Sequence, residues 1–206
     1  MTTEFLEALL NQLNDFKSYP KYQFERRIDA FIAFFLKHVL TANLGLEIDT
    51  IWPEFPVRIS SDNHRTTNID YACYSRTASK CVFIELKTDK RSIRSEQLDY
   101  YHMAMDKSWG DHIADIDAVS VKSREKAKYQ KLVQELAGVP APLTVESIYL
   151  APIAIKSKFW TLVKEKGREK DWIFLSLESF AESDINTEYP AEWEIVSKAI
   201  RGACSH

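Results

Sequence analysis

Apolar residues recur at helical spacing in several parts of the chain. The clearest repeat lies within residues 21–41, where apolar side chains return every three or four positions at Phe24, Ile28, Phe31, Phe35 and Val39. This spacing predicts a helix with one buried face, and Pro20 lies at its natural start. Similar patterns predict four more helices, at residues 3–16, 92–107, 121–137 and 192–200.

Other stretches are rich in β-branched and aromatic residues and predict strands. Residues 68–74 and 80–87 are separated by a short polar segment, which favours an antiparallel hairpin. Residues 46–60 contain two prolines and predict an edge strand or two short pieces. Further strands are expected at 145–150 and 172–177. This order of helices and strands predicts an α/β sandwich around a mixed sheet.

Composition narrows the class of protein. A length of 206 residues favours one domain, and 45% hydrophobic with 28% charged residues excludes a disordered or collagen-like chain. The longest apolar runs, such as residues 31–36, are far shorter than the roughly 20 residues of a membrane span. The start of the chain lacks the features of a secretory signal, and the three cysteines form no C-x-x-C pair. We therefore expect a cytoplasmic protein without membrane spans.

Charge is unevenly distributed along the chain. Residues 171–197 contain seven acidic side chains and no Lys or Arg, although the formal net charge is only -3. This segment favours a surface that faces solvent, a protein partner or a second copy of the chain. Basic residues gather at 87–94, 122–131 and 156–170. Such clusters could contact phosphates, but a solvated surface is their commoner explanation.

The predicted strand at 80–87 ends in two charged residues. Both of its faces are apolar until Glu85 and Lys87, and a strand of that kind is usually central and covered. A buried carboxylate and ammonium need partners or a purpose. One interpretation is an ion pair where the strand reaches solvent.

Asp70, on the preceding strand, suggests a second interpretation. In the predicted hairpin the carboxylates of Asp70 and Glu85 could converge. Two like charges at that range raise each other's pKa unless a cation lies between them. Oxygen ligands without His or Cys suit a hard cation such as Mg²⁺ or Mn²⁺.

These residues resemble a known family. Asp70 followed by Glu85-Leu86-Lys87 is similar to the signature of the PD-(D/E)XK nuclease superfamily in both spacing and strand placement. The proline that usually precedes the Asp is replaced by Ile69. The resemblance implies a restriction-endonuclease-like α/β/α sandwich around a central mixed sheet. It implies one domain over 1–206, with the core motifs at about 21–107 and an elaboration at about 140–206.

Two flanking features extend the resemblance, which covers residues 25–101. Glu25 lies on the preceding helix, where many members place an acidic residue that contacts the metal through water. Gln97 and Tyr101 are similar to the Gln-x-x-x-Tyr motif of RecB-like and lambda-exonuclease-like branches. Simpler interpretations remain open, since Glu25 suits the first turn of a helix and Gln97 could be merely exposed.

The family resemblance implies a metal-dependent nuclease that acts on nucleic acid, with DNA favoured. Asp70, Glu85 and the Leu86 carbonyl would hold Mg²⁺ or Mn²⁺, with Glu25 behind them. Lys87 would orient the attacking water, and Gln97 with Tyr101 would fix the substrate or the site. Phosphate contacts would come from Arg91, Arg94 and the basic cluster at 122–131. The alternative is a catalytically silent nuclease-fold module that binds nucleic acid or protein.

Other chemistries have less support in the sequence. The chain has five glycines and neither a Gly-x-Gly-x-x-Gly motif nor a phosphate-binding Gly-Lys loop. His102, Asp111 and His112 lack the spacing of a helical zinc site. These two histidines are expected to lie on the surface or in the core.

Overall fold

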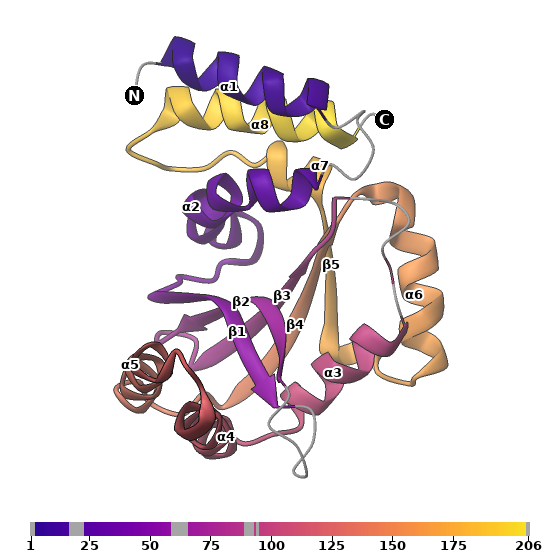
Figure 1. Ribbon diagram of the computed structural model, residues 1–206. Helices are drawn as coiled ribbons and strands as arrows, with labels where there is room; N and C mark the ends of the chain where they lie inside the picture. Colours follow the sequence, from indigo (N-terminus) through magenta and orange to yellow (C-terminus); the bar gives the residue numbers. More distant parts are fainter. Residues whose placement is uncertain (1–2, 17–22, 59–65, 89–92, 94, 205–206) are drawn as a thin grey trace.

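The computed structural model describes residues 3–16, 23–58, 66–88, 93 and 95–204 (Figure 1). Pro20, the expected start of the second helix, lies outside the described residues. Arg91 and Arg94, the expected phosphate contacts, also lie outside them.

The described strands form one five-stranded mixed sheet in the order β1-β2-β3-β4-β5. Strands β1, β2 and β3 pair antiparallel, whereas β4 and β5 run parallel to β3. Their bounds are Thr50–Arg58, Thr66–Ser75, Lys80–Leu86, Thr144–Ala151 and Trp172–Ser176. The predicted hairpin of β2 and β3 is confirmed. The proline-containing segment forms a single edge strand, β1, because an edge position tolerates a missing N–H donor.

Helices cover both faces of the sheet (Figure 1). One face carries α2 (Phe24–Leu44), α7 (Leu177–Ala181) and α8 (Pro190–Cys204), and α1 (Thr3–Phe16) packs on α8 farther from the sheet. The other carries α3 (Ser95–Met105), α4 (Trp109–Lys122), α5 (Lys126–Ala137) and α6 (Lys156–Glu165). Short 3₁₀ turns lie at Ile153–Ile155 and Glu169–Asp171. The predicted α/β/α sandwich with a mixed sheet is confirmed. None of the described helices is both long and apolar enough to cross a membrane.

The expected helix at 121–137 is wrong in its extent. Two helices, α4 and α5, meet at residues 123–125, and α4 begins well before the predicted start. The beginning of α4 is fixed by a capping box, in which Ser108 and Asp111 bond to each other's backbone N–H. The helices α6 and α7 were not predicted, because their short apolar stretches lie among charged or strand-like residues.

Strand β3 is the centre of both cores. Val82, Ile84 and Leu86 pack with the α1, α2 and α8 side, whereas Cys81 and Phe83 pack with the α3 to α6 side. Every residue from Cys81 to Lys87 is buried. The prediction that both faces of this strand are covered is therefore confirmed. Glu85 and Lys87, which alternate with Phe83, are thereby placed on the α3 side.

In strand β2 the regular alternation of side chains between the two faces of the sheet is interrupted at Asp70. Ile69 and Ala72 both pack in the core on the α3 side, although Tyr71 packs in the opposite core. A regular strand would put Ile69 and Tyr71 on the same face. Opposite this point β1 is also distorted, since Glu54 has a positive φ of 51°. The irregularity frees Asp70 from ordinary strand pairing and leaves its side chain available to β3.

Replacing Phe83 by Ala should lower the free energy of unfolding by about 3–5 kcal/mol, because it empties a fully buried position of the central strand. Urea denaturation measures this loss. Leu143→Ala is the control, since Leu143 is 85% exposed and its truncation should change stability by about 0.5 kcal/mol at most. Equal effects of the two substitutions would contradict the assignment of the core.

Candidate active site

The predicted site residues meet at the end of β3 that leads toward α3. Asp70 comes from the middle of β2, and Glu85 with Lys87 comes from the end of β3. Gln97 and Tyr101 project from α3, one helical turn apart. Direct contacts link Asp70 to β3 and α3 to Glu85. The structure brings these five residues together at one strand end.

Asp70 connects the two strands through its side chain. Its Oδ2 accepts a hydrogen bond of 2.7 Å from the backbone N–H of Leu86. The last paired residues of this hairpin are Tyr71 and Ile84, so the Asp70 carboxylate continues the connection beyond the backbone ladder. This bond fixes the carboxylate beside the end of β3.

Glu85 is the most enclosed charged group of the site, with 1% of the residue exposed. Its Oε1 accepts from Gln97 Nε2 and forms an ion pair with Lys87 Nζ. Its Oε2 accepts from the Tyr101 hydroxyl at 2.5 Å. The same hydroxyl lies 3.1 Å from the Ile84 carbonyl oxygen. The Gln-x-x-x-Tyr pair therefore contacts the Glu85 carboxylate directly.

Glu25 approaches from the opposite layer, in the first turn of α2. Its Oε2 accepts a hydrogen bond of 3.2 Å from the backbone N–H of Thr88, the residue after Lys87. This backbone contact places Glu25 beside the end of β3. The placement in the first turn of α2 also suits the helix macrodipole.

Burial and mutual repulsion disfavour ionisation of the carboxylates. Burial, followed by repulsion from Glu85, raises the pKa of Asp70 to about 8. Attraction to Lys87 and the hydrogen bond from Leu86 oppose this rise only in part. Burial also raises the pKa of Glu85, although its contacts with Lys87 and Tyr101 act in the other direction.

Lys87 remains protonated in this environment. Burial alone lowers the pKa of its ammonium, but the nearby carboxylates of Glu85, Glu25 and Asp70 outweigh that effect and the net pKa is raised. Among the described residues, the ammonium of Lys87 thus faces three carboxyl groups. The cluster is short of positive charge whenever all three are ionised.

The carboxylates of Asp70, Glu85 and Glu25 are suitable groups for a hard divalent cation. They supply oxygen atoms, and their negative charge exceeds the positive charge of Lys87. The present conformation is arranged differently. Among the described residues, no three His, Cys, Asp or Glu side chains are grouped to hold a metal ion. Glu85 instead faces Lys87, Gln97 and Tyr101. A cation that uses Oε1 of Glu85 would have to displace the ammonium of Lys87.

Helix α3 is held against the sheet by contacts that the sequence did not reveal. The Tyr101 ring lies 5.3 Å from the Trp172 ring, and Trp172 Nε1 donates to His102 Nε2 at 2.8 Å. Two ion pairs join this part of the chain to the segment that follows α6: Lys166 pairs with Asp99 in α3, and Arg168 pairs with Asp106 directly after α3. Part of the basic cluster at 156–170 therefore positions the helix that carries Gln97 and Tyr101.

The two candidate zinc histidines belong to the core, as expected. His112 is 1% exposed and its Nε2 lies 2.9 Å from the Ala104 carbonyl oxygen, whereas His102 accepts from Trp172. Burial lowers the pKa of both imidazoles, which favours their neutral form.

The basic cluster at 122–131 lies on exposed turns of α4 and α5. Two of its lysines have acidic partners, since Lys128 pairs with Glu125 and Lys131 Nζ lies 3.6 Å from Glu135 Oε1. Helix α5 is attached to β1, where Trp52 Nε1 donates to Glu135 Oε2 at 3.0 Å. The cluster is thus an exposed surface whose charge is partly offset.

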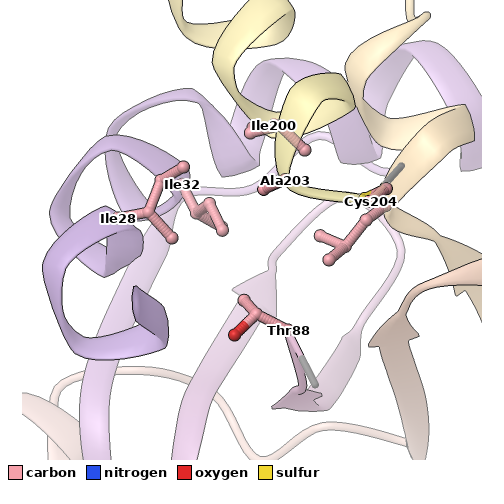
Figure 2. Close-up of a pocket in the computed structure, with 7 residues that line it drawn as sticks. Ile28, Ile32, Thr88, Ile200, Ala203 and Cys204 are labelled. Carbon is pink, nitrogen blue, oxygen red and sulfur yellow. The ribbon is translucent and has the colours of Figure 1, made fainter. Parts of the chain in front are cut away.

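An apolar pocket adjoins the strand end on the α2 side. It lies beside Thr88, and its lining comes largely from α2 and α8 (Figure 2). The lining residues are Ile28, Ile32, Thr88, Leu177, Ile200, Ala203 and Cys204. Since almost all of them are apolar, this pocket offers little to a phosphate, and the polar chemistry lies on the α3 side.

Tyr149 is the site neighbour that sequence reasoning missed. It occupies the position opposite Glu85 in the parallel register of β3 and β4. The strand that contains it was predicted, but its pairing with β3 was not, because more than fifty residues separate the two strands. The signal in the sequence was only a Tyr within an apolar run.

Comparison of this chain with protein-family models, with curated proteins and with solved structures finds no match. The site therefore has to be interpreted from its own geometry.

The raised pKa of Asp70 predicts a pH-dependent stability. The pKa is about 8 in the folded chain and its ordinary value is 3.8, so the folded state binds more protons between these values. The stability linked to protonated Asp70 should be complete below about pH 4 and lost as the pH rises through about 8. Melting temperatures of wild type and Asp70→Asn, measured with a chelator, should diverge with rising pH in favour of the variant. Parallel curves over this range would contradict the proposed charge crowding.

Proposed function

We propose that this protein is a divalent-cation-dependent nuclease that hydrolyses phosphodiester bonds of nucleic acid, with DNA as the favoured substrate. The observation that carries the proposal is the meeting of Asp70, Glu85 and Lys87 at one strand end, where three carboxyl groups including Glu25 crowd a single ammonium. Support for the PD-(D/E)XK type comes from the contact of both Gln97 and Tyr101 with Glu85.

The chain's own residues have distinct roles in this proposal. Asp70, Glu85 and the Leu86 carbonyl would hold Mg²⁺ or Mn²⁺, with Glu25 acting through water. The bound cation would polarise the scissile phosphate and acidify a water molecule. Gln97 and Tyr101 keep the Glu85 carboxylate in place, because each donates to a different oxygen of that carboxylate.

Lys87 is the group proposed to act on the reacting atoms. Its protonated ammonium orients the attacking water or neutralises the charge that develops on phosphorus. Attack in line with the leaving group expels the sugar oxygen. Exposed lysines of α5 and the two arginines Arg91 and Arg94 would contact backbone phosphates. A reaction of this kind on nucleic acid is compatible with a cytoplasmic protein.

One observation favours a second candidate, a catalytically silent nuclease-fold module that binds nucleic acid or a protein. Lys87 already pairs with Glu85, and the described residues contain no preformed metal group. In such a module the ion pair would serve only to neutralise a buried carboxylate. The exposed acidic residues of segment 171–197, namely Glu182, Asp184, Glu188 and Glu194, would then offer a surface to a protein partner or a second copy.

We expect cleavage of labelled DNA in the presence of Mg²⁺ or Mn²⁺, with single- and double-stranded DNA and RNA tested side by side. Asp70→Asn and Glu85→Gln should abolish cleavage, because each removes a charged ligand. Lys87→Met should reduce the rate by about 10²-fold, the usual effect of losing one group that stabilises the transition state.

Lys80→Met is the matched control. Lys80 lies at the other end of β3, where its Nζ pairs with Glu146 Oε1 at 2.8 Å. This variant should cleave like wild type. Absence of cleavage of all four substrates by folded wild-type protein would overturn the nuclease proposal and favour the silent module.

A further inference from the structure

Tyr149 has a buried hydroxyl beside the candidate site that lacks a hydrogen-bond partner. The residue is 2% exposed, and its hydroxyl oxygen is among the few buried side-chain atoms of the described residues without such a partner. Buried hydroxyls are nearly always paired, because leaving one unpaired costs free energy. An orphan at this place therefore calls for a partner in another state of the site.

The position of Tyr149 limits which partner that can be. Tyr149 is aligned with Glu85 on the adjacent parallel strand, and both belong to the α3 side of the sheet. Neighbouring strands lie about 4.8 Å apart, so aligned side chains on one face are neighbours. After burial itself, the charge of Glu85 is the largest influence that raises the pKa of Tyr149.

The aromatic ring of Tyr149 is fixed by its surroundings. It stacks on Phe159 with the ring centres 4.5 Å apart, and it lies 6.2 Å from the Trp172 ring. The ring cannot swing away without opening this aromatic cluster. Its hydroxyl therefore stays where it is, and a new partner has to come from movement at the site.

The Glu85 carboxylate has room for another donor. An ionised carboxylate offers about four lone-pair positions on two oxygens. Within the described part of the chain, Oε1 contacts both Gln97 and Lys87, whereas Oε2 accepts one hydrogen bond, from Tyr101. If Lys87 leaves, Oε1 keeps only Gln97 among these partners, and the carboxylate can shift toward a further donor.

We propose that Tyr149 is a positioning residue for Glu85, whose hydroxyl donates to the Glu85 carboxylate when Lys87 moves from that carboxylate to the substrate. The inference rests on the proposed function, because that function requires Lys87 to act on the reacting atoms. The site then has two arrangements. Lys87 neutralises Glu85 in the resting arrangement, and Tyr149 holds the same carboxylate in the working arrangement.

A double-mutant cycle tests this exchange without metal or substrate. In wild type, Tyr149→Phe should leave the melting temperature unchanged or raise it, because it removes an unpaired hydroxyl. In a Lys87→Met background the same substitution should lower the melting temperature, because Tyr149 has become a donor to Glu85. An equal effect of Tyr149→Phe in both backgrounds would overturn the proposal. Lys87→Gln replaces Lys87→Met with the same expected pattern if the methionine variant does not fold.

The affinity for Mn²⁺ gives a second measurement. It is obtained from the rise in melting temperature as Mn²⁺ is added. Tyr149→Phe should raise the dissociation constant for Mn²⁺ about 10-fold, as loss of a residue that orients a metal ligand usually does. Tyr71→Phe is the control, because its buried hydroxyl already bonds to Asp29 on the opposite face. That variant should melt earlier and bind Mn²⁺ like wild type.

The measurements distinguish failure of the role of Tyr149 from failure of the proposed function. Equal affinity of wild type and Tyr149→Phe for Mn²⁺ would overturn the positioning role of Tyr149 in the working arrangement. No binding of Mn²⁺ by wild type would instead overturn the proposed function, and the double-mutant cycle would still decide whether Tyr149 replaces Lys87 at Glu85.

Discussion

A carboxylate enclosed at the end of a central strand has to be satisfied by its neighbours, and this constraint from Glu85 organises the α3 side of the molecule. Gln97 and Tyr101 donate to it from α3, and Lys87 neutralises it from the same strand. Helix α3 has its own attachments to the sheet through Trp172 and two ion pairs. The position of one carboxylate is thus determined by elements far apart in the sequence.

The charges of this cluster are poorly suited to stability alone. A buried ion pair is weak support for stability, because desolvation offsets most of its attraction. Here Asp70 and Glu25 add like charges to the pair, and burial with repulsion raises the pKa of Asp70 to about 8. An apolar strand end would avoid this cost. Such an arrangement is typical of functional sites, where perturbed carboxyl groups gather.

Local patterns predicted the parts of the site that depend on short-range structure. The hairpin of β2 and β3, the two apolar faces of β3 and the helix that carries Gln97 and Tyr101 all follow from spacing and composition. The meeting of Asp70 with the end of β3 follows from the hairpin. The actual bond, from Leu86 N–H to Asp70, depends on the change of facing in β2, which alternation alone does not predict.

Long-range pairing explains what the sequence did not predict. The parallel pairing of β3 and β4 places Tyr149 opposite Glu85, and Trp172 on β5 contacts α3. The basic cluster that contains Lys166 and Arg168 could contact phosphates by its sequence. In the structure both residues instead form ion pairs, with Asp99 in α3 and with Asp106 directly after it. Spacing along the chain carries no information about such contacts, because they depend on how distant strands are ordered in the sheet.

A crystal structure of the wild-type protein soaked with Mn²⁺ would show, through the anomalous signal of the metal, whether the carboxylates at the end of β3 hold a cation. We expect metal density bonded to Asp70, Glu85 and the Leu86 carbonyl, with the ammonium of Lys87 turned away from Glu85. An intact pair of Lys87 and Glu85, with no anomalous density beside Asp70 at millimolar Mn²⁺, would contradict it.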